Sequence, residues 1–117
     1  MIKRVIPIVM MFTAIFPTKA FAGCGYASHY GVGDGFDGNI TANGERFNAW
    51  ARTVAHKWLP FGTKIRVTNQ RNGASVVVRV NDRGPYYGDR ILDLSYGAFS
   101  QIAPPSRGEA KVCYRVL

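Results

Sequence analysis

The sequence predicts a mainly β protein, a compact and mostly antiparallel barrel with one or two short helices. Two runs of residues alternate between apolar and polar with the period of two that a half-buried strand requires. Between them, Asn72-Gly73 is a favoured hairpin turn, and Gly, Asn and Pro interrupt the rest of the chain at short intervals. Neither an internal repeat nor a low-complexity segment is present, so we expect one domain.

The amino terminus predicts a secretory signal peptide over residues 1–22. Met1–Arg4 is positively charged, Val5–Phe16 is apolar but too short to span a bilayer, and Ala20-Phe21-Ala22 fits a cleavage site. Cleavage leaves 95 of the 117 residues, 23–117, enough for one small domain. We expect an exported protein, periplasmic or secreted, with no stable membrane span.

The composition excludes several classes of protein. With 47% hydrophobic and 19% charged residues, the chain is typical of a folded domain and not of a disordered tail. Three of the 15 Lys and Arg lie in the signal, which leaves 12 against 7 Asp and Glu, a net charge of +5. The basic residues are scattered and form no nucleic-acid motif, so no nucleic acid is expected as partner, and we expect a monomer.

The two cysteines, Cys24 and Cys113, lie at opposite ends of the expected domain. An even number of cysteines in an exported protein favours a disulfide between the opening and closing strands. The alternative is lipidation, because Phe21-Ala22-Gly23-Cys24 approximates the box before a lipidated cysteine and would make the protein an outer-membrane lipoprotein. The cysteine and histidine spacings fit no metal-ligand template, so neither metal nor cofactor is expected.

Two strands form the predicted hairpin, Thr63–Asn69 and Ser75–Val80, joined across Asn72-Gly73. Their apolar residues recur at every second position and are expected to point into the barrel. These residues are Ile65, Val67, Val76, Val78 and Val80.

Three further elements complete the prediction. Gly25–Tyr30 is expected to form an opening strand, and Lys111–Leu117 a closing strand with Val112, Tyr114 and Val116 on one side. Ser95 can cap a short helix from Tyr96 to Ile102, which Pro104-Pro105 ends.

Polar residues suited to chemistry stand in the segments between these strands. Glu45 follows a Gly turn, His56 precedes a strand, and Asp82 follows one. Taken singly, each also fits an ordinary role, as a solvated loop acid, a hydrogen-bonding core histidine and a turn residue respectively.

Together these segments resemble the rare lipoprotein A family of bacterial septal lytic transglycosylases. The resemblance covers nearly the whole chain after the signal, through TANGERF, AHKWLPFGTKIRVTN and SVVVRVNDRGPYYGDRILDLS. It implies a six-stranded double-psi β-barrel over residues 23–117, with the family's catalytic Glu, His and Asp on Glu45, His56 and Asp82.

The resemblance also implies an activity on peptidoglycan glycan strands. Such an enzyme cleaves the β-1,4 bond between N-acetylmuramic acid and N-acetylglucosamine endolytically, leaves a 1,6-anhydro end, and prefers strands without stem peptides. Asp82 would act as acid and then as base. His56 would orient Asp82 or bind a sugar hydroxyl, and Glu45 would assist by its charge or hold substrate. The alternatives are a non-catalytic, expansin-like module that binds or loosens wall glycan, and a protein-interaction or inhibitor module.

Two positions complicate this assignment. The family commonly has Asp three residues after the GERF glutamate, where this chain has Asn48, so a carboxylate is missing. Asp93 in ILDLS is a rival acid, because the segment resembles the one that carries the acid in expansins and related glycoside hydrolases. Otherwise Asp93 is expected to support the turn into the helix that begins after Ser95.

Substrate contacts are expected next to Asp82. We place Tyr86 and Tyr87 at the rim of the cleft, because aromatic faces stack on sugar rings, and expect Arg83 and Asn81 to contact the substrate as well.

Overall fold

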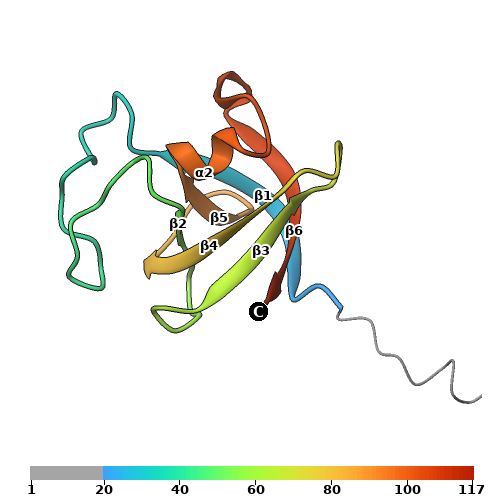
Figure 1. Cartoon of the computed structure of the whole chain (residues 1–117), viewed down its shortest axis with the longest axis horizontal. Coiled ribbons are helices and arrows are strands. Elements are labelled where there is room, and N and C mark those ends of the chain that lie inside the picture. The colour runs from blue at the N-terminus through green and yellow to red at the C-terminus, as the bar shows by residue number, and fades with distance from the viewer. Residues whose placement is uncertain (1–19) are drawn as a thin grey trace, which may run out of the picture.

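The computed structural model describes residues 20–117, which form a closed barrel of six strands (Figure 1). Around the barrel the order is β1-β5-β2-β4-β3-β6. The strands are β1 (Gly23–Tyr30), β2 (Thr53–Ala55), β3 (Lys64–Asn69), β4 (Ser75–Asp82), β5 (Arg90–Ser95) and β6 (Glu109–Val116). Four pairings are antiparallel and two, β1 with β5 and β2 with β4, are parallel, which confirms the mostly antiparallel barrel. Most of the expected signal lies outside the described residues.

The predicted hairpin is present as β3 and β4. Ile65 lies opposite Val78 and Val67 opposite Val76, and all four side chains are buried in the core. Gly73 takes a φ of 77° in the connection between the strands, a conformation that costs Gly little. The alternating pattern therefore predicted both the pairing and the inward face.

β2 and β5 do not show this apolar–polar alternation in the sequence. β2 has only three residues, all buried, so it shows no alternation, and β5 lies between two strands with both its faces largely covered. In β6, Val112 and Tyr114 are buried, while Val116 lies exposed at the end of the strand.

The helix α2 (Tyr96–Ser100) begins as predicted and ends earlier. The Ala98 N–H donates to Ser95 Oγ at 3.2 Å, which confirms the cap, but Ile102 already lies in the turn that leads to the 3-10 helix η1 (Pro105–Arg107). Within the part of the chain that the structure describes, no helix is long and apolar enough to cross a membrane.

The seam of the barrel joins the first strand to the last. β1 and β6 are antiparallel, Cys24 lies directly opposite Cys113, and a disulfide joins the two residues. The predicted disulfide is confirmed, and it leaves Cys24 no thiol for a lipid.

Replacing both cysteines by serine should lower the free energy of unfolding by about 2–4 kcal/mol. The reason is that the disulfide closes a loop across 89 positions of sequence and so restricts the unfolded chain. Chemical denaturation of the oxidised protein, the reduced protein and the double variant measures the difference. Equal midpoints for all three would contradict the prediction.

Candidate active site

A cleft of about 350 Å³ opens on the barrel between residues of β1, β4 and β5. Three carboxyl groups line it, those of Asp34, Asp82 and Asp93. Asp34 accepts from the N–H groups of Gly31 and Phe36 in its own loop, whereas Asp82 and Asp93 lie on strands. In the sheet, Ala55 of β2 pairs with Asp82 of β4 on one side and with Asp93 of β5 on the other. The two acids therefore stand two strands apart, about 10 Å between backbones.

Asp82 accepts hydrogen bonds from three different parts of the chain. Its Oδ2 accepts from Tyr30 Oη at 2.9 Å, and its Oδ1 accepts from the Ala42 N–H at 2.9 Å and the Arg83 N–H at 3.0 Å. These donors fix the orientation of the carboxylate in the cleft wall, as preorganised catalysis requires.

Tyr30 is a site residue that the sequence analysis did not assign. Burial, followed by the charge of Asp82, raises the pKa of the Tyr30 hydroxyl, so it stays a neutral donor. Stacking on Phe47, with ring centroids 4.4 Å apart, holds the Tyr30 ring in place. The motif ASHYG contains Tyr30, but its partner is 52 residues away and the sequence gives no signal for the contact.

Asp93 has a very different environment from Asp82. Burial raises its pKa from 3.8 to about 6, and its one side-chain hydrogen bond comes from Ser28 Oγ, which donates to Oδ1 at 3.1 Å. Asp93 does not support the turn into α2, because Ser95 caps that helix alone and Asp93 faces the cleft. A carboxyl group with this pKa can carry a proton at mildly acidic pH.

The expected substrate residues divide into two groups. Tyr86 and Tyr87 line the cleft and are 72% and 69% exposed, which suits the predicted rim. Arg83 forms part of the wall, with its guanidinium 4.0 Å from the centre of the Phe61 ring. Asn81 is only 1% exposed, so its side chain lies in the core and not in the cleft.

The Glu45 carboxylate does not line the cleft. It forms a bidentate ion pair with Arg79 of β4, at 2.7 and 3.0 Å, and accepts from Asn43 Nδ2 at 2.7 Å. The Arg79 guanidinium is the main reason why the pKa of Glu45 falls to about 2. Glu45 is therefore a permanent anion and cannot donate a proton.

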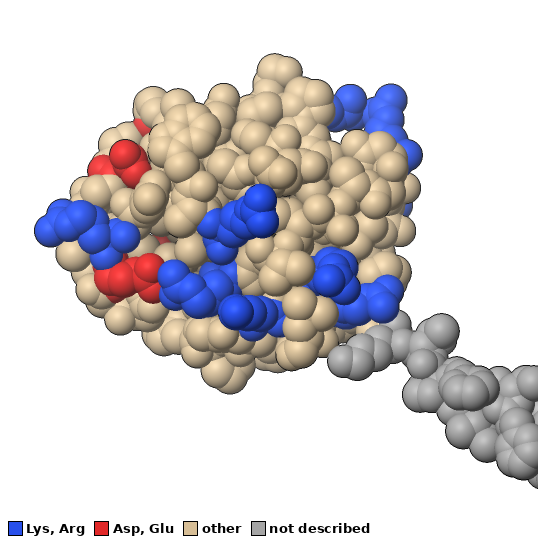
Figure 2. Space-filling model, in the orientation of Figure 1, with Lys and Arg blue, Asp and Glu red and all other residues tan. Residues whose placement is uncertain are grey.

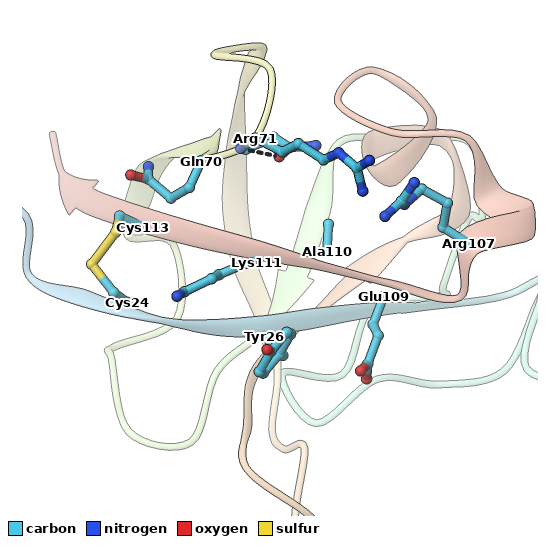
Figure 3. Close-up of a pocket in the computed structure, with 10 residues that line it drawn as sticks. Cys24, Tyr26, Gln70, Arg71, Arg107, Glu109, Ala110, Lys111 and Cys113 are labelled. Carbon is cyan, nitrogen blue, oxygen red and sulfur yellow. Dashed lines mark hydrogen bonds between the residues drawn. A yellow bond between two sulfur atoms is a disulfide. The ribbon is translucent and has the colours of Figure 1, made fainter.

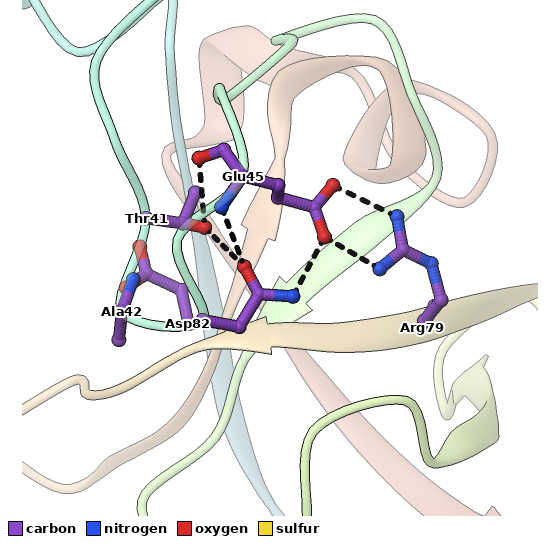
Figure 4. Close-up of polar contacts among 6 residues, drawn as sticks. Thr41, Ala42, Glu45, Arg79 and Asp82 are labelled. Atoms are coloured by element: carbon purple, nitrogen blue, oxygen red, sulfur yellow. Dashed lines mark hydrogen bonds and ion pairs between the residues drawn. The ribbon is translucent and has the colours of Figure 1, made fainter.

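The Glu45 ion pair instead anchors the loop that holds Asp82. Figure 4 shows Glu45 reaching from the loop to Arg79 while Ala42, in the same loop, lies beside Asp82. The turn is closed by the Gly44 N–H, which donates to the Thr41 carbonyl at 2.9 Å. By fixing this loop, Glu45 helps to position the Ala42 N–H that donates to Asp82.

The His56 side chain is also outside the cleft and is 3% exposed. Its Nδ1 accepts from the backbone N–H groups of Trp58 and Leu59, both at 3.1 Å, so the ring proton is on Nε2, which donates to Tyr114 Oη at 2.7 Å. Burial lowers its pKa and keeps it neutral.

The His56 backbone reaches Asp82 and its neighbour. The His56 N–H donates to the Asp82 carbonyl at 3.1 Å, and Arg83 Nη1 donates to the His56 carbonyl at 3.2 Å. The three residues named by the sequence therefore belong to segments that meet at Asp82, but of their side chains only that of Asp82 faces the cleft.

Asn48 does not deprive the cleft of a carboxylate. Its Oδ1 accepts from the Trp50 N–H at 2.9 Å, a turn contact that an Asp oxygen makes equally well, and the residue does not line the cleft.

The barrel, its sheet order and this cleft define a double-psi β-barrel protein. A family model described as "Lytic transglycolase" matches residues 22–114, and the chain belongs to that family, in the branch of RlpA-like barrels.

Two relatives illustrate the match. The chain is 58% identical over 93 residues to the "Probable endolytic peptidoglycan transglycosylase RlpA" of a Nostoc species, covering 80% of this chain and 25% of the relative. It is 48% identical over 94 residues to the "Endolytic peptidoglycan transglycosylase RlpA" of Pseudomonas aeruginosa, covering 80% of this chain and 27% of the relative. The chain therefore spans about a quarter of the length of these relatives.

Two solved structures share the barrel. A Streptomyces papain inhibitor matches with a TM-score of 0.66 at 22% identity, covering 86% of this chain and 99% of that chain, which shows the fold alone. An expansin from Clavibacter michiganensis, solved as a mutant in complex with cellohexaose, matches with a TM-score of 0.63 at 25% identity, covering 80% of this chain and 49% of that chain.

Glu45→Gln and Arg79→Gln should have equal effects that do not add. Each variant breaks the same half-exposed ion pair, so each should cost about 0.5–1 kcal/mol of stability, and the double variant should be no worse. Unfolding curves test this. Lys64→Gln, on the strand opposite Arg79, is the matched control. Additive losses of stability would mean that the two residues do not act as one pair.

His56→Ala should destabilise the fold by about 2–4 kcal/mol. The substitution removes the acceptor for two backbone N–H groups, leaves the Tyr114 hydroxyl unpaired and opens a cavity. Thermal unfolding measures the loss, with the exposed Lys57→Ala as control. A stable but inactive His56→Ala protein would contradict the positioning role.

Proposed function

We propose that the protein is an endolytic lytic transglycosylase of peptidoglycan. It cleaves the β-1,4 bond between N-acetylmuramic acid and N-acetylglucosamine and leaves a 1,6-anhydro end. The observation that carries this proposal is that the two strand carboxyl groups of one cleft have different surroundings. Asp82 accepts from three donors, and Asp93 is buried with a pKa of about 6. Different environments for two acids are the usual basis for dividing acid and base roles.

In this mechanism the two proton transfers belong to different residues. Asp93, protonated, donates its proton to the glycosidic oxygen, and the bond from that oxygen to the muramyl anomeric carbon breaks. The muramyl 6-hydroxyl attacks the same carbon and gives its proton to Asp82, closing the anhydro ring. Proton exchange with solvent then returns both carboxyl groups to their starting states. This replaces the expectation that Asp82 performs both steps.

The remaining groups of the cleft serve these two acids. Tyr30 keeps the Asp82 carboxylate aimed into the cleft, and the exposed rings of Tyr86 and Tyr87 offer stacking faces for the sugars on either side of the scissile bond. Glu45 and His56 hold the two backbone segments against Asp82.

The proposed substrate is a glycan strand without stem peptides, and the proposed compartment is the periplasm or the exterior. The support for export is the sequence of residues 1–22, the disulfide, and relatives whose names place their activity on peptidoglycan.

A non-catalytic role is the second candidate, because the expansin solved in complex with cellohexaose shares the barrel at 25% identity. The two functions differ in their products. Incubation with glycan strands stripped of stem peptides should give ends that are lighter by one water than hydrolysis products, seen by mass spectrometry. A pure binder retains the strands and creates no new ends.

Asp93→Asn and Asp82→Asn should each lower kcat/KM by about 10²–10⁴, because each removes one proton transfer. For the native protein, kcat/KM should decline as the pH rises above about 6, where Asp93 loses its proton. Asp89→Asn, exposed in the segment before β5, is the control and should keep the native rate. A native rate in Asp93→Asn would return both steps to Asp82.

Stability separates this role from a structural one. Because burial raises the pKa of Asp93 from 3.8 to about 6, the folded protein binds more protons than the unfolded chain in that range, and the contribution of Asp93 is lost as the pH rises through it. Above pH 6 the buried charge is a cost, so Asp93→Asn should raise the free energy of unfolding by about 1–3 kcal/mol at pH 7. A destabilised variant would indicate a turn-supporting residue.

A further inference from the structure

A second hollow on the described part of the surface is larger than the cleft. It is a groove of about 850 Å³ over the outer face of β1 and β6, bounded by the β3–β4 connection and η1 (Figure 3). No step of the proposed reaction uses it. We call it the β1–β6 groove. Its lining residues on β1 and β6 include Cys24, Tyr26, Ala110, Lys111 and Cys113.

The floor of the groove is apolar and its edges are basic. The disulfide and the largely buried Ala110 are its apolar lining, and the Tyr26 ring, 37% exposed, stands at one side. Arg71, Arg107 and Lys111 reach in from three different elements, and the guanidinium groups of Arg71 and Arg107 point towards one another in Figure 3.

These three cations have no described partner. The ion pairs among residues 20–117 are Arg79 with Glu45 and Arg90 with Glu109, and neither involves a cation of the groove. Glu109, the one carboxylate in the lining, is engaged by Arg90 at 3.4 Å. Like charges facing each other across a hollow repel, and a bound anion relieves that repulsion.

The β1–β6 groove borders the catalytic cleft. Glu109 lines the groove and Arg90 lines the cleft, so their ion pair lies on the wall between the two hollows. Across the sheet, Tyr26 of the groove is opposite Arg90, and Ser28 of the cleft is opposite Glu109. Along β1 the two hollows reach from Cys24 to Tyr30, about 20 Å at the rise of a strand.

We propose that the β1–β6 groove is a distal subsite that binds a muramyl residue through its free lactyl carboxylate. The proposal rests on the proposed function and deepens it. Tyr26 stacks on the sugar ring, and Arg71, Arg107 and Lys111 bind the carboxylate. The rest of the glycan strand crosses the Arg90–Glu109 ion pair and enters the cleft. An aromatic ring beside an apolar floor and three cations fits a sugar acid better than an extended acidic peptide, which needs a sheet edge or helix groove.

This subsite gives a chemical reason for preferring stripped strands. In intact peptidoglycan the lactyl carboxyl is bound in an amide to the stem peptide and carries no charge. Removal of the peptide frees one carboxylate on every muramyl residue and turns the strand into a regular polyanion. The groove therefore recognises the product of an amidase reaction, one that hydrolyses the bond between lactyl group and peptide.

Binding of stripped strands to the Asp82→Asn protein tests the subsite without turnover. The Arg71→Gln/Arg107→Gln double variant on that background should bind about tenfold more weakly, since two charge-assisted contacts are lost. Lys64→Gln/Arg66→Gln, which removes two charges from the basic outer face of β3 (Figure 2), is the matched control and should bind like the parent. Equal affinity of the groove variant and this control would overturn the proposal.

A second arm identifies the group that is bound. Strands whose lactyl carboxylates are capped as methylamides should bind the parent about as weakly as uncapped strands bind the groove variant. Capped strands that bind like uncapped ones would overturn the proposal, as would a polyglutamate peptide that competes as well as the glycan. If the strands bind in this way but are never cleaved, the proposed function fails and the subsite stands.

Discussion

The pairing of Ala55 with two acids at once is the constraint on which the rest of the site depends. β2 is only three residues long, yet it lies between β4 and β5, parallel to one and antiparallel to the other. That register brings Asp82 and Asp93 to the same end of the barrel from segments with different surroundings. A slip of one residue would turn an acid towards the core. The apolar packing of β2 therefore sets the relative position of the Asp82 and Asp93 carboxyl groups.

The residues around Asp82 differ in whether their side chains line the cleft or stabilise the segments behind it. Asp82 is held by donors from β1, from the loop of Ala42 and from its own neighbour, so three distant segments must fold together before the carboxylate is aimed. From outside the cleft, Glu45 fixes the loop of Ala42 through Arg79, and His56 fixes its own turn through the N–H groups of Trp58 and Leu59. The side chains of Glu45 and His56 thus support the cleft wall without lining it.

The sequence predicted what depends on local pattern. The alternating valines of β4, the Ser95 cap and the disulfide are all confirmed. β2 and β5 could not be predicted from alternation, because strands covered on both faces carry none. The same limit applies to the site. The family resemblance pointed to Asp82 and the neighbouring aromatic residues to a rim at Tyr86 and Tyr87, all of which line the cleft, but neither gave information on where the Glu45 and His56 side chains point. The β1–β6 groove is invisible in the sequence, since its cations come from three separate segments.

The pairing of β1 with β5 and β6 determines when the barrel can close during folding. β1 is the first strand to leave the ribosome, and its partners, β5 and β6, are the last two. Until β5 and β6 are synthesised, β1 has two unpaired edges. Cys24 likewise has no disulfide partner until Cys113 is synthesised. Such a topology has a high contact order, which slows folding. The barrel therefore cannot close until the last segment of the described chain is available, because β1 has no other strand to pair with.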